Sequence, residues 1–368
     1  MSNSLSSAAP SNGISNSRHT PKYNVSVADL ERLVGMEFLR ATELAALAAH
    51  SWMGKGNKEA GDEAASEAIR GHFSTVNISG LVTIGEGIKD DAPGIFKGEK
   101  LGVWSPGSLK MAIALDPIDG TTIVAKGLNG AVSVIAAATC ADESEDPMSM
   151  LADIPSFYMQ KIAVGPKVAT GPVQVRLDNS VKENLEIVAL KLGKRVQDVT
   201  VSILDRPRHG ELIQEVRSTG ATIRLISDGD IAGAIAPSLP DAGVDIYMGT
   251  GGSPEAVLAA AAVKCLGGEI FARMWPRDEA ERADLKKRNV TDKDLAKIWK
   301  SEDLARGEGT LFAATGISDS PLLRGVRFSG HHASTHSILM RGQYRTVRYV
   351  RTIHDMDHKR FPSPAKRK

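Results

Sequence analysis

An apolar run at residues 112–122, AIALDPIDGTT, ends abruptly in two carboxylates. Its first four residues predict a buried strand, Asp116 follows them directly, and Asp119 comes three positions later. The intervening proline fixes one backbone angle, and Gly120 opens the next turn. We therefore expect both carboxylates to point to one place, with the backbone amides of residues 120–122 available to an anionic oxygen. This combination predicts a site for a metal ion and a phosphate.

Two more carboxylates stand in similar surroundings. Asp62 lies on a helix that should begin after Asn57, and Glu86 stands between two glycines in TIGEG. Ligands of open α/β sheets bind where the carboxyl ends of strands meet loops. Four carboxylates gathered there would repel one another unless a cation held them together, and Mg²⁺ or Mn²⁺ prefers such oxygen ligands. A single Asp at a strand end more often caps a turn or a helix, so the indication comes from the set.

The first half of the chain shows two helix patterns followed by strand patterns. Apolar residues recur with a helical period over 29–53, and a second helix should follow Asn57. Short apolar runs then end in glycine or acid, which is typical of central strands covered on both faces. These predicted strands are GLVTIGEG (80–87), MAIALDPIDG (111–120) and AVSVIAAAT (131–139).

The second half shows a more regular β-α-β-α-β-α succession from residue 199 to 267, which implies right-handed crossovers and a mostly parallel sheet. The charged segment 276–308 predicts a helical surface insertion or a helix pair that faces another subunit, and late strands should complete the fold. The expected strands are 199–209, 221–230, 244–254, 310–317 and 336–354, and the expected helices are 210–220, 231–239 and 255–267.

Length and composition limit the class of partner. A chain of 368 residues predicts two domains, because a single hydrophobic core rarely grows past about 300 residues. The net charge of +1 gives no field that would draw the chain to nucleic acid or to a membrane, so we expect a small-molecule ligand. No apolar run approaches the ~18 residues of a membrane span, which indicates a soluble protein.

The cysteines and the chain ends give weaker indications of the compartment and of terminal structure. Cys140 and Cys265 both stand in apolar surroundings, so we expect buried, inert thiols in a reducing compartment rather than a disulfide or a redox switch. The first two dozen residues are rich in Ser and Asn and lack any acid or apolar core, which favours a disordered tail over 1–27; an organelle transit peptide is the alternative. Residues 356–368 predict a short basic tail.

The motif LDPIDGTT resembles the signature of the lithium-sensitive, metal-dependent sugar phosphatases, a superfamily that includes inositol monophosphatases and fructose-1,6-bisphosphatases. From about residue 30 to 355 the chain is similar to one branch, the class II fructose-1,6-bisphosphatases. Separate blocks carry this resemblance in order: GKGNKEAGDEAA, VTIGEGIKDDAP, LDPIDGTT, FYMQKIAVGP, ILDRPRH, ISDGDIAGAI, GTGGSPEAVLAAAAVKCLGG and FAATGI. The resemblance implies a layered αβαβα fold of two α/β domains, with a metal-binding phosphatase domain over 28–170 and a substrate-binding domain over 171–355.

The resemblance also implies roles for individual residues. Asp62 and Glu86 would hold one ion, Asp116 and Asp119 a second, and Glu255 would complete the site, with Mn²⁺ or Mg²⁺ as cofactor. Glu86 is also a candidate base, and Thr121 matches a threonine thought to activate or deliver the attacking oxygen. The matched substrate-binding positions are Asp119, Gly120, Thr121, Tyr158, Arg206, Arg208, Asp228, Gly229, Asp230 and Gly252.

Several of these roles make physical sense on their own. Arg206 and Arg208 lie two apart beyond a predicted strand and could face one phosphate bidentately, although surface salt bridges are the alternative. His209 is as readily a packing or orienting residue. Asp228 and Asp230 could accept hydrogen bonds from sugar hydroxyls or cap the following helix.

The implied reaction is metal-assisted hydrolysis of fructose 1,6-bisphosphate to fructose 6-phosphate and phosphate, in cytoplasmic gluconeogenesis, by a dimer or tetramer. Attack by water and attack by the Thr121 hydroxyl both stay open, as do the choice of metal and sedoheptulose 1,7-bisphosphate as a second substrate. An inositol or nucleotide phosphatase is a rival, against which the paired arginines argue. A non-catalytic sugar-phosphate sensor is another, but it would be expected to lack a metal-binding carboxylate, and none is missing.

Overall fold

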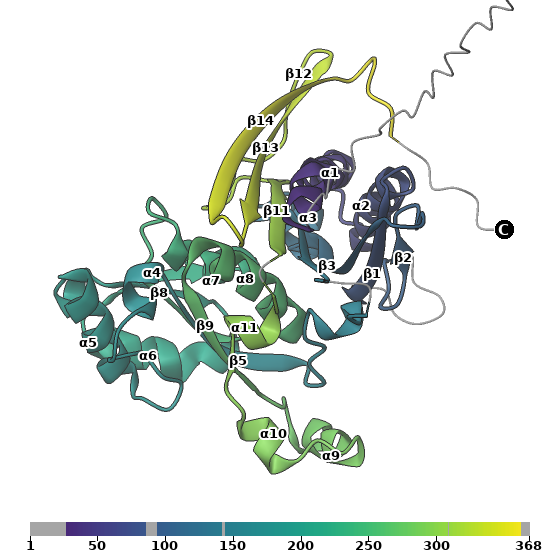
Figure 1. Cartoon of the computed structure of the whole chain (residues 1–368). Helices are drawn as coiled ribbons and strands as arrows, with labels where there is room; N and C mark the ends of the chain where they lie inside the picture. Colours follow the sequence, from purple (N-terminus) through teal and green to yellow (C-terminus); the bar gives the residue numbers. More distant parts are fainter. Residues whose placement is uncertain (1–26, 86–93, 142–143, 308, 362–368) are drawn as a thin grey trace, which may run out of the picture.

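The computed structural model describes residues 27–85, 94–141, 144–307 and 309–361 (Figure 1). Apart from Val27, the predicted N-terminal tail lies outside these residues, as do residues 362–368 of the predicted basic tail. Within the described ranges, no helix is both long and apolar enough to cross a membrane. Cys140 and Cys265 are buried, as predicted.

Two helices precede the first sheet, as the sequence predicts. They are α1 (Val27–His50) and α2 (Lys58–Phe73). The Asn57 side chain caps α2 by accepting a hydrogen bond from the backbone N of Ala60 at 3.0 Å, which satisfies one of the amides left open at a helix start. The rings of Phe38 and Phe73 meet edge to face at 5.1 Å and join the two helices.

The first sheet has eight strands in the order β12-β13-β11-β4-β3-β1-β2, with β14 paired to β13. Among the residues that the structure describes, β1 and β3 form the one parallel pair of this sheet, and its other pairs are antiparallel. The short helix α3 (Thr121–Lys126) connects β3 to β4. The strands are β1 (Ile78–Ile84), β2 (Lys100–Leu101), β3 (Leu109–Asp119), β4 (Val132–Thr139), β11 (Thr310–Gly316), β12 (Arg327–Ser329), β13 (His332–Arg341) and β14 (Thr346–Asp355).

The second sheet has six strands in the order β10-β9-β5-β8-β6-β7. The predicted mostly parallel sheet is wrong: β6 pairs in parallel with β7 and β8, but β5, β9 and β10 pair antiparallel. The reason is that β5, which precedes the β-α-β series, runs opposite to β8 and lies between β8 and β9, so both of its pairings are antiparallel. Strand β9 runs in the same direction as β8, and β10 runs opposite to β9. The strands are β5 (Tyr158–Val164), β6 (Thr200–Leu204), β7 (Thr222–Ile226), β8 (Ile246–Gly252), β9 (Glu269–Met274) and β10 (Trp299–Lys300).

The helices of the second half follow the predicted succession, with α6, α7 and α8 after β6, β7 and β8. The charged segment forms a projecting arm, which we define as residues 276–298 and which carries α9 and α10 (Figure 1). The helices are α4 (Pro166–Ala169), α5 (Val181–Leu192), α6 (Gly210–Ser218), α7 (Asp230–Ile235), α8 (Ser253–Leu266), α9 (Glu279–Lys287), α10 (Asp292–Ala296) and α11 (Ser301–Leu304).

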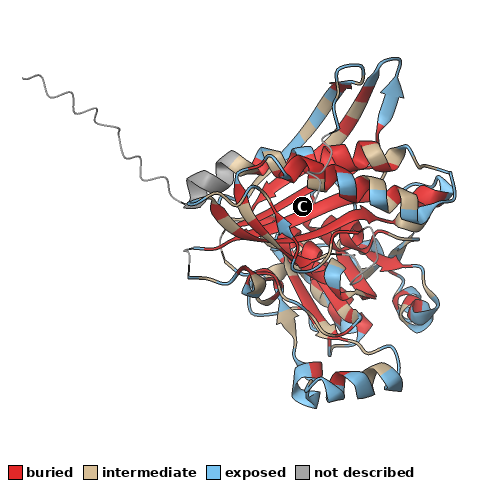
Figure 2. Cartoon of the chain, turned by 90° about the vertical axis from the view of Figure 1, so that its right-hand side faces the viewer, coloured by how far each residue is buried: buried red, intermediate tan, exposed pale blue. Residues whose placement is uncertain are grey.

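Helices and sheets alternate in five layers, which confirms the predicted αβαβα arrangement. Helices α1 and α2 pack on one face of the first sheet, and α5 and α6 cover the outer face of the second. Between the sheets lie α7 and α8, whose apolar residues join strands of both sheets in one core. Figure 2 shows the central strands buried and the arm largely exposed.

The two sheets draw on interleaved stretches of the chain. Strand β5 precedes residue 170 and belongs to the second sheet, whereas β11 to β14 return to the first sheet from residue 310 onward. The predicted boundary between residues 170 and 171 concerns domains rather than sheets, and it stays a prediction.

A series of hydrogen bonds between buried hydroxyl groups links α1 to the first sheet. Thr42 Oγ1 lies 2.8 Å from Thr315 Oγ1 on β11, which in turn lies 2.8 Å from Ser337 Oγ on β13. All three side chains are fully buried. Because Thr315 is the shared partner, its hydroxyl satisfies two other buried polar groups.

We predict that Thr315→Val lowers the free energy of unfolding by about 1–2 kcal/mol, because valine keeps the shape but removes that shared partner. Urea denaturation followed by circular dichroism measures the change. Thr222→Val, at an exposed position on β7, serves as the control and should change stability by less than about 0.5 kcal/mol. Equal stability of the two variants would contradict the prediction.

Candidate active site

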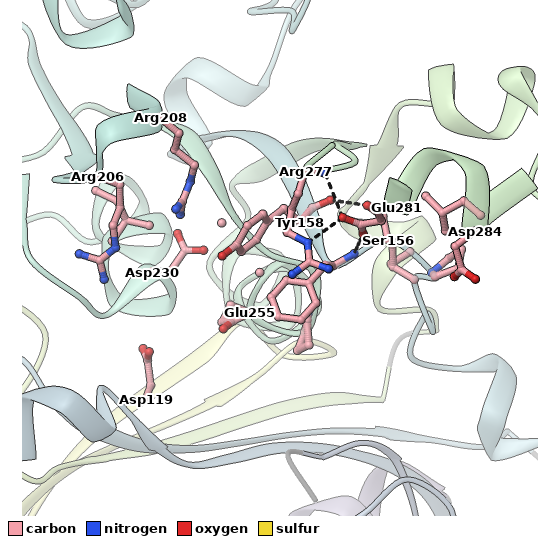
Figure 3. Close-up of a pocket in the computed structure, with 18 of the residues that line it drawn as sticks. Asp119, Ser156, Tyr158, Arg206, Arg208, Asp230, Glu255, Arg277, Glu281 and Asp284 are labelled. Atoms are coloured by element: carbon pink, nitrogen blue, oxygen red, sulfur yellow. Dashed lines mark hydrogen bonds and ion pairs between the residues drawn. The ribbon is translucent and has the colours of Figure 1, made fainter. Parts of the chain in front are cut away.

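A cavity of about 790 Å³ lies where the two sheets meet (Figure 3). The end of β3, the start of β5, the loops after β6 and β7, and the turn between β8 and α8 all contribute to its lining. Eight of the residues predicted for the site line it: Asp119, Tyr158, Arg206, Arg208, Asp228, Asp230, Gly252 and Glu255. The fold therefore brings together residues from both halves of the sequence.

The turn after β3 buries both of its carboxylates, Asp116 at 4% and Asp119 at 5% exposure. Asp116 Oδ1 accepts a hydrogen bond from the backbone N of Ile118 at 2.9 Å, and the pairing of β3 with β4 shifts register between the two aspartates. Gly120 follows with φ 102°, a left-handed conformation that favours glycine, and α3 starts at Thr121 with no side-chain cap. Asp119 thus lines the cavity, whereas Asp116 does not.

Asp62 lies on α2 and does not line the cavity. Its Oδ1 is buried without a hydrogen-bond partner in the described part of the chain. Burial raises the pKa of Asp62 to about 6, against a smaller opposing effect of the Arg70 guanidinium. A carboxylate in these surroundings is costly to ionise unless a cation approaches it.

Glu255 stands in the first turn of α8, and its Oε2 is likewise buried without a partner among the described residues. Burial raises the pKa of Glu255, although the Lys161 charge acts in the opposite direction. A Cβ on Gly252 would lie 1.7 Å from Glu255 Oε2. Only glycine at residue 252 therefore leaves space for this carboxylate.

The protein itself compensates the charge of Asp230. Lys161 Nζ, on β5, donates to Asp230 Oδ2 and to the carbonyl oxygen of Gly252 at 3.0 Å, and the Tyr247 hydroxyl donates to Asp230 Oδ1. Lys161 and Tyr247 are buried, and burial together with Asp230 raises the pKa of Tyr247. A Cβ on Gly251 would lie 1.9 Å from Asp230 Oδ2, so this glycine also makes room for a carboxylate.

Sequence reasoning missed Lys161 and Tyr247. The signal for Lys161 was a single charge inside the apolar strand pattern YMQKIAV, since a lysine there must find a partner on folding. Nothing in the pattern of β8 distinguishes Tyr247 from an ordinary core residue.

Arg206 and Arg208 lie on the same side of the cavity (Figure 3). Arg206 Nη2 donates to Asp228 Oδ1 at 3.3 Å, and Arg208 Nε donates to the carbonyl oxygen of Thr250 at 2.9 Å. The Arg208 guanidinium also stacks on the Tyr158 ring, 4.7 Å from its centroid. Arg208 is thus anchored through Nε, whereas Arg206 also donates through Nη1 to the carbonyl oxygens of Asp205 and Ser227. Each cation still keeps at least one further N–H group for an anion.

His209 orients the loop that carries these arginines. Its Nε2 accepts a hydrogen bond from the backbone N of Thr250 at 2.7 Å, so the proton is on Nδ1, which donates to the carbonyl oxygen of Leu204 at 2.7 Å. Burial lowers the pKa of His209 and keeps the ring neutral. The orienting role considered from the sequence is therefore confirmed.

Gly229 does not line this cavity but stands beside it. It has φ 84°, lines a smaller cavity of about 210 Å³ that shares Asp228 with the first, and a Cβ on it would lie 4.0 Å from Asp119 Oδ2. The loop after β7 in the second sheet therefore reaches the turn after β3 in the first.

The predicted metal ligands, and the predicted substrate contacts in the turn after β3, are brought together only in part. Asp119 and Glu255 share the cavity, but Asp62, Asp116, Gly120 and Thr121 do not line it, and Glu86 lies outside the described residues. Among the residues that the structure describes, no three His, Cys, Asp or Glu side chains lie close enough together to hold an ion. The full ligand set therefore stays a prediction.

The arm forms a further part of the cavity wall, which the sequence did not predict. The arm contributes Arg277, Glu281, Asp284, Leu285 and Arg288 to the lining, and Figure 3 shows Arg277 and Glu281 beside Ser156 and Tyr158. The sequence predicts that this segment is a surface insertion or a helix pair that faces another subunit. It is largely exposed, yet one of its faces completes the wall.

Comparison with known proteins gives a consistent result. The model of the family of bacterial, glpX-encoded fructose-1,6-bisphosphatases matches residues 32–354. A class 2 fructose-1,6-bisphosphatase of Haemophilus influenzae is 39% identical over 338 residues, covering 89% of this chain and 98% of the relative. A class 2 D-fructose 1,6-bisphosphatase/sedoheptulose 1,7-bisphosphatase of Synechococcus sp. (strain JA-3-3Ab) is 39% identical over 350 residues, covering 89% of this chain and 97% of the relative. The chain belongs to the glpX-type, class II fructose-1,6-bisphosphatase family.

Proposed function

We propose that this cavity hydrolyses one phosphate of fructose 1,6-bisphosphate, giving fructose 6-phosphate and inorganic phosphate. The proposal rests on one observation. Two acidic side chains, Asp119 and Glu255, and two basic ones, Arg206 and Arg208, line separate parts of the same cavity (Figure 3). A sugar with a phosphate at each end matches such a division, provided that cations cover the acidic end. The names of the curated relatives support the same substrate.

The arginine side holds the phosphate that is not cleaved. Arg208 is fixed by Thr250 and stacked on Tyr158, and Arg206 is fixed by Asp228, so two guanidinium groups converge before a substrate arrives. Charge-assisted hydrogen bonds to phosphate are strong and directional. This preformed arrangement selects a bisphosphate over a monophosphate and turns its other end toward Asp119.

Buried carboxylates on the acidic side fit a divalent metal centre. Unpartnered buried oxygens of Asp62 and Glu255, and the space that Gly252 leaves beside Glu255, are what hard cations with oxygen ligands need. We assign Asp62, Glu86, Asp116, Asp119 and Glu255 to Mn²⁺ or Mg²⁺. Bound ions would neutralise the phosphoryl oxygens and lower the pKa of a coordinated water.

The chain's own groups act on the phosphoryl oxygens and on the attacking oxygen. Backbone amides of Gly120, Thr121 and Thr122 orient the phosphoryl oxygens, and Lys58 Nζ, which donates to Thr122 Oγ1 at 2.8 Å, steadies that turn. Glu86 takes the proton of the attacking water; alternatively, the Thr121 hydroxyl delivers the attack. Asp228 and Asp230 bind sugar hydroxyls.

Sedoheptulose 1,7-bisphosphate is a second candidate substrate. Two Synechococcus relatives carry both activities in their names. The cavity of about 790 Å³ exceeds the needs of a six-carbon sugar, so one further carbon can be accommodated. We further propose that the enzyme acts in the cytoplasm as a dimer or tetramer, a state in which the arm could contact another subunit.

Phosphate release from a panel of sugar phosphates tests the proposed function. We expect cleavage of fructose 1,6-bisphosphate with Mn²⁺ or Mg²⁺, none with excess chelator, and little activity on inositol phosphates or nucleotides. Asp116→Asn should lower turnover at least ~100-fold, since the amide keeps the hydrogen bond from Ile118 but loses the charge. The control Asp198→Asn, at a surface salt bridge with Arg195, should keep normal turnover. Normal turnover in the Asp116 variant would refute the assignment.

The Asp62 carboxylate gives a prediction for the metal-free protein. In the folded protein the pKa of Asp62 is about 6, which is higher than its ordinary value of 3.8. At neutral pH the ionised Asp62 therefore lowers the free energy of unfolding, and this destabilisation disappears as the pH falls toward 4. Asp62→Asn should therefore stabilise the metal-free protein at pH 7.5 by on the order of 1 kcal/mol, and the gain should shrink at pH 4.5.

Thermal unfolding with chelator or with Mn²⁺ measures both effects. Added Mn²⁺ should raise the Tm of the unmodified chain more than that of the variant, because only the unmodified chain offers the charged ligand. An equal response of both proteins to Mn²⁺ would remove Asp62 from the proposed ligand set.

A further inference from the structure

Glu281 connects the arm to the substrate half of the cavity. Its side chain is only 10% exposed, although the helix that carries it, α9, buries only Leu285. Glu281 Oε1 accepts a hydrogen bond from the backbone N of Phe157 at 2.8 Å. Its Oε2 accepts from Arg277, through the backbone N at 2.9 Å and Nε at 2.8 Å. One carboxylate therefore receives three hydrogen bonds from two segments.

Capping of α9 does not account for these bonds. Asp278 is the N-cap, and its side chain accepts a hydrogen bond from the backbone N of Glu281 at 2.8 Å. In a capping box, a glutamate at this position would reach back to the N-cap amide. Here the carboxylate reaches instead to Phe157, 124 positions earlier in the chain. Burial alone would raise the pKa of Glu281, but the hydrogen bonds from Arg277 and Phe157 outweigh it and hold that pKa below its ordinary value.

Phe157 precedes Tyr158, the first residue of β5, and other bonds hold this segment from the opposite side. Ser253 N donates to the carbonyl oxygen of Phe157 at 3.1 Å, and Ser253 Oγ donates to that of Ser156 at 2.6 Å. Ser253 begins α8, which also carries Glu255. The segment 156–158 thus lies between the turn that presents a proposed metal ligand and the carboxylate of the arm.

Tyr158 connects this segment to Arg208 on the other side of the cavity. Its ring meets Phe157 edge to face at 5.0 Å and lies beneath the Arg208 guanidinium at 4.7 Å. The backbone N of Trp275, just before the arm, donates to the Tyr158 carbonyl oxygen at 2.9 Å. A shift of the Phe157 amide would therefore move the surface against which Arg208 rests.

We infer that Glu281 is a positioning residue of the arm, which fixes Tyr158 and through it Arg208 for the uncleaved phosphate. The inference rests on the proposed function and assigns to the arm a part in substrate affinity. It follows that a change at Glu281 weakens binding of the sugar bisphosphate and leaves the chemistry at the cleaved phosphate unaltered.

The test is Glu281→Gln, with Glu279→Gln as the matched control on the same helix, where the Glu279 side chain is 92% exposed. Glutamine keeps the size but points an amide N–H₂ at the donors of Arg277 or Phe157. We expect KM for fructose 1,6-bisphosphate to rise about 5–10-fold, kcat to stay within about 2-fold, and inhibition by fructose 6-phosphate to weaken by the same factor as KM rises. The control should match the unmodified enzyme.

A small phosphate monoester distinguishes a loss of substrate positioning from a general loss of activity or stability. Hydrolysis of p-nitrophenyl phosphate needs only the acidic side, so Glu281→Gln should leave it within about 2-fold. An unchanged KM for the bisphosphate overturns the inference, and so does an equal loss on both substrates together with a lowered Tm. Failure of the unmodified enzyme to cleave any sugar bisphosphate would instead refute the proposed function, so the two failures are distinguishable.

Discussion

Buried negative charge between the two sheets is the constraint on which the site depends. Asp116, Asp119 and Asp230 are each at most 6% exposed, and a desolvated carboxylate is costly unless something compensates it. The protein compensates Asp230 itself, through Lys161 and Tyr247. For Asp62 and Glu255 it leaves a buried oxygen without a hydrogen bond in the described part of the chain. Asp230 is therefore suited to orient its neighbours, whereas Asp62 and Glu255 are suited to bind a cation.

Glycines near the cavity are explained by the same constraint. Gly251 and Gly252 stand where any Cβ would overlap the carboxylate of Asp230 or Glu255, and Gly120 supplies the left-handed turn after Asp119. These positions are fixed by the space that acidic side chains occupy. Substitutions there would displace a carboxylate before they disturbed either hydrophobic core.

The sequence predicted the parts of the site that short-range chemistry determines. The cap at Asn57, the turn from Asp116 to Gly120 and the alternation after residue 199 all depend on neighbouring residues, and each forms as expected. Strand pairing was not predictable, because a period of two fixes which face a residue occupies and not which strand lies beside it. For the same reason the role of the arm was missed: Glu281 and Phe157 are 124 positions apart in the chain and meet only in the folded structure.

Helix α8 explains how one cavity can receive groups from two sheets. Its run from Ala256 to Val263 is buried throughout, and it contacts β3, β4 and β11 on one side and β5, β8 and β9 on the other. Alanines present little bulk, so both sheets approach the same helix closely. The first turn of α8 then stands where the end of β3 and the start of β5 converge, and Glu255 projects from that turn. The small residues of this helix therefore allow groups from both sheets to line one cavity.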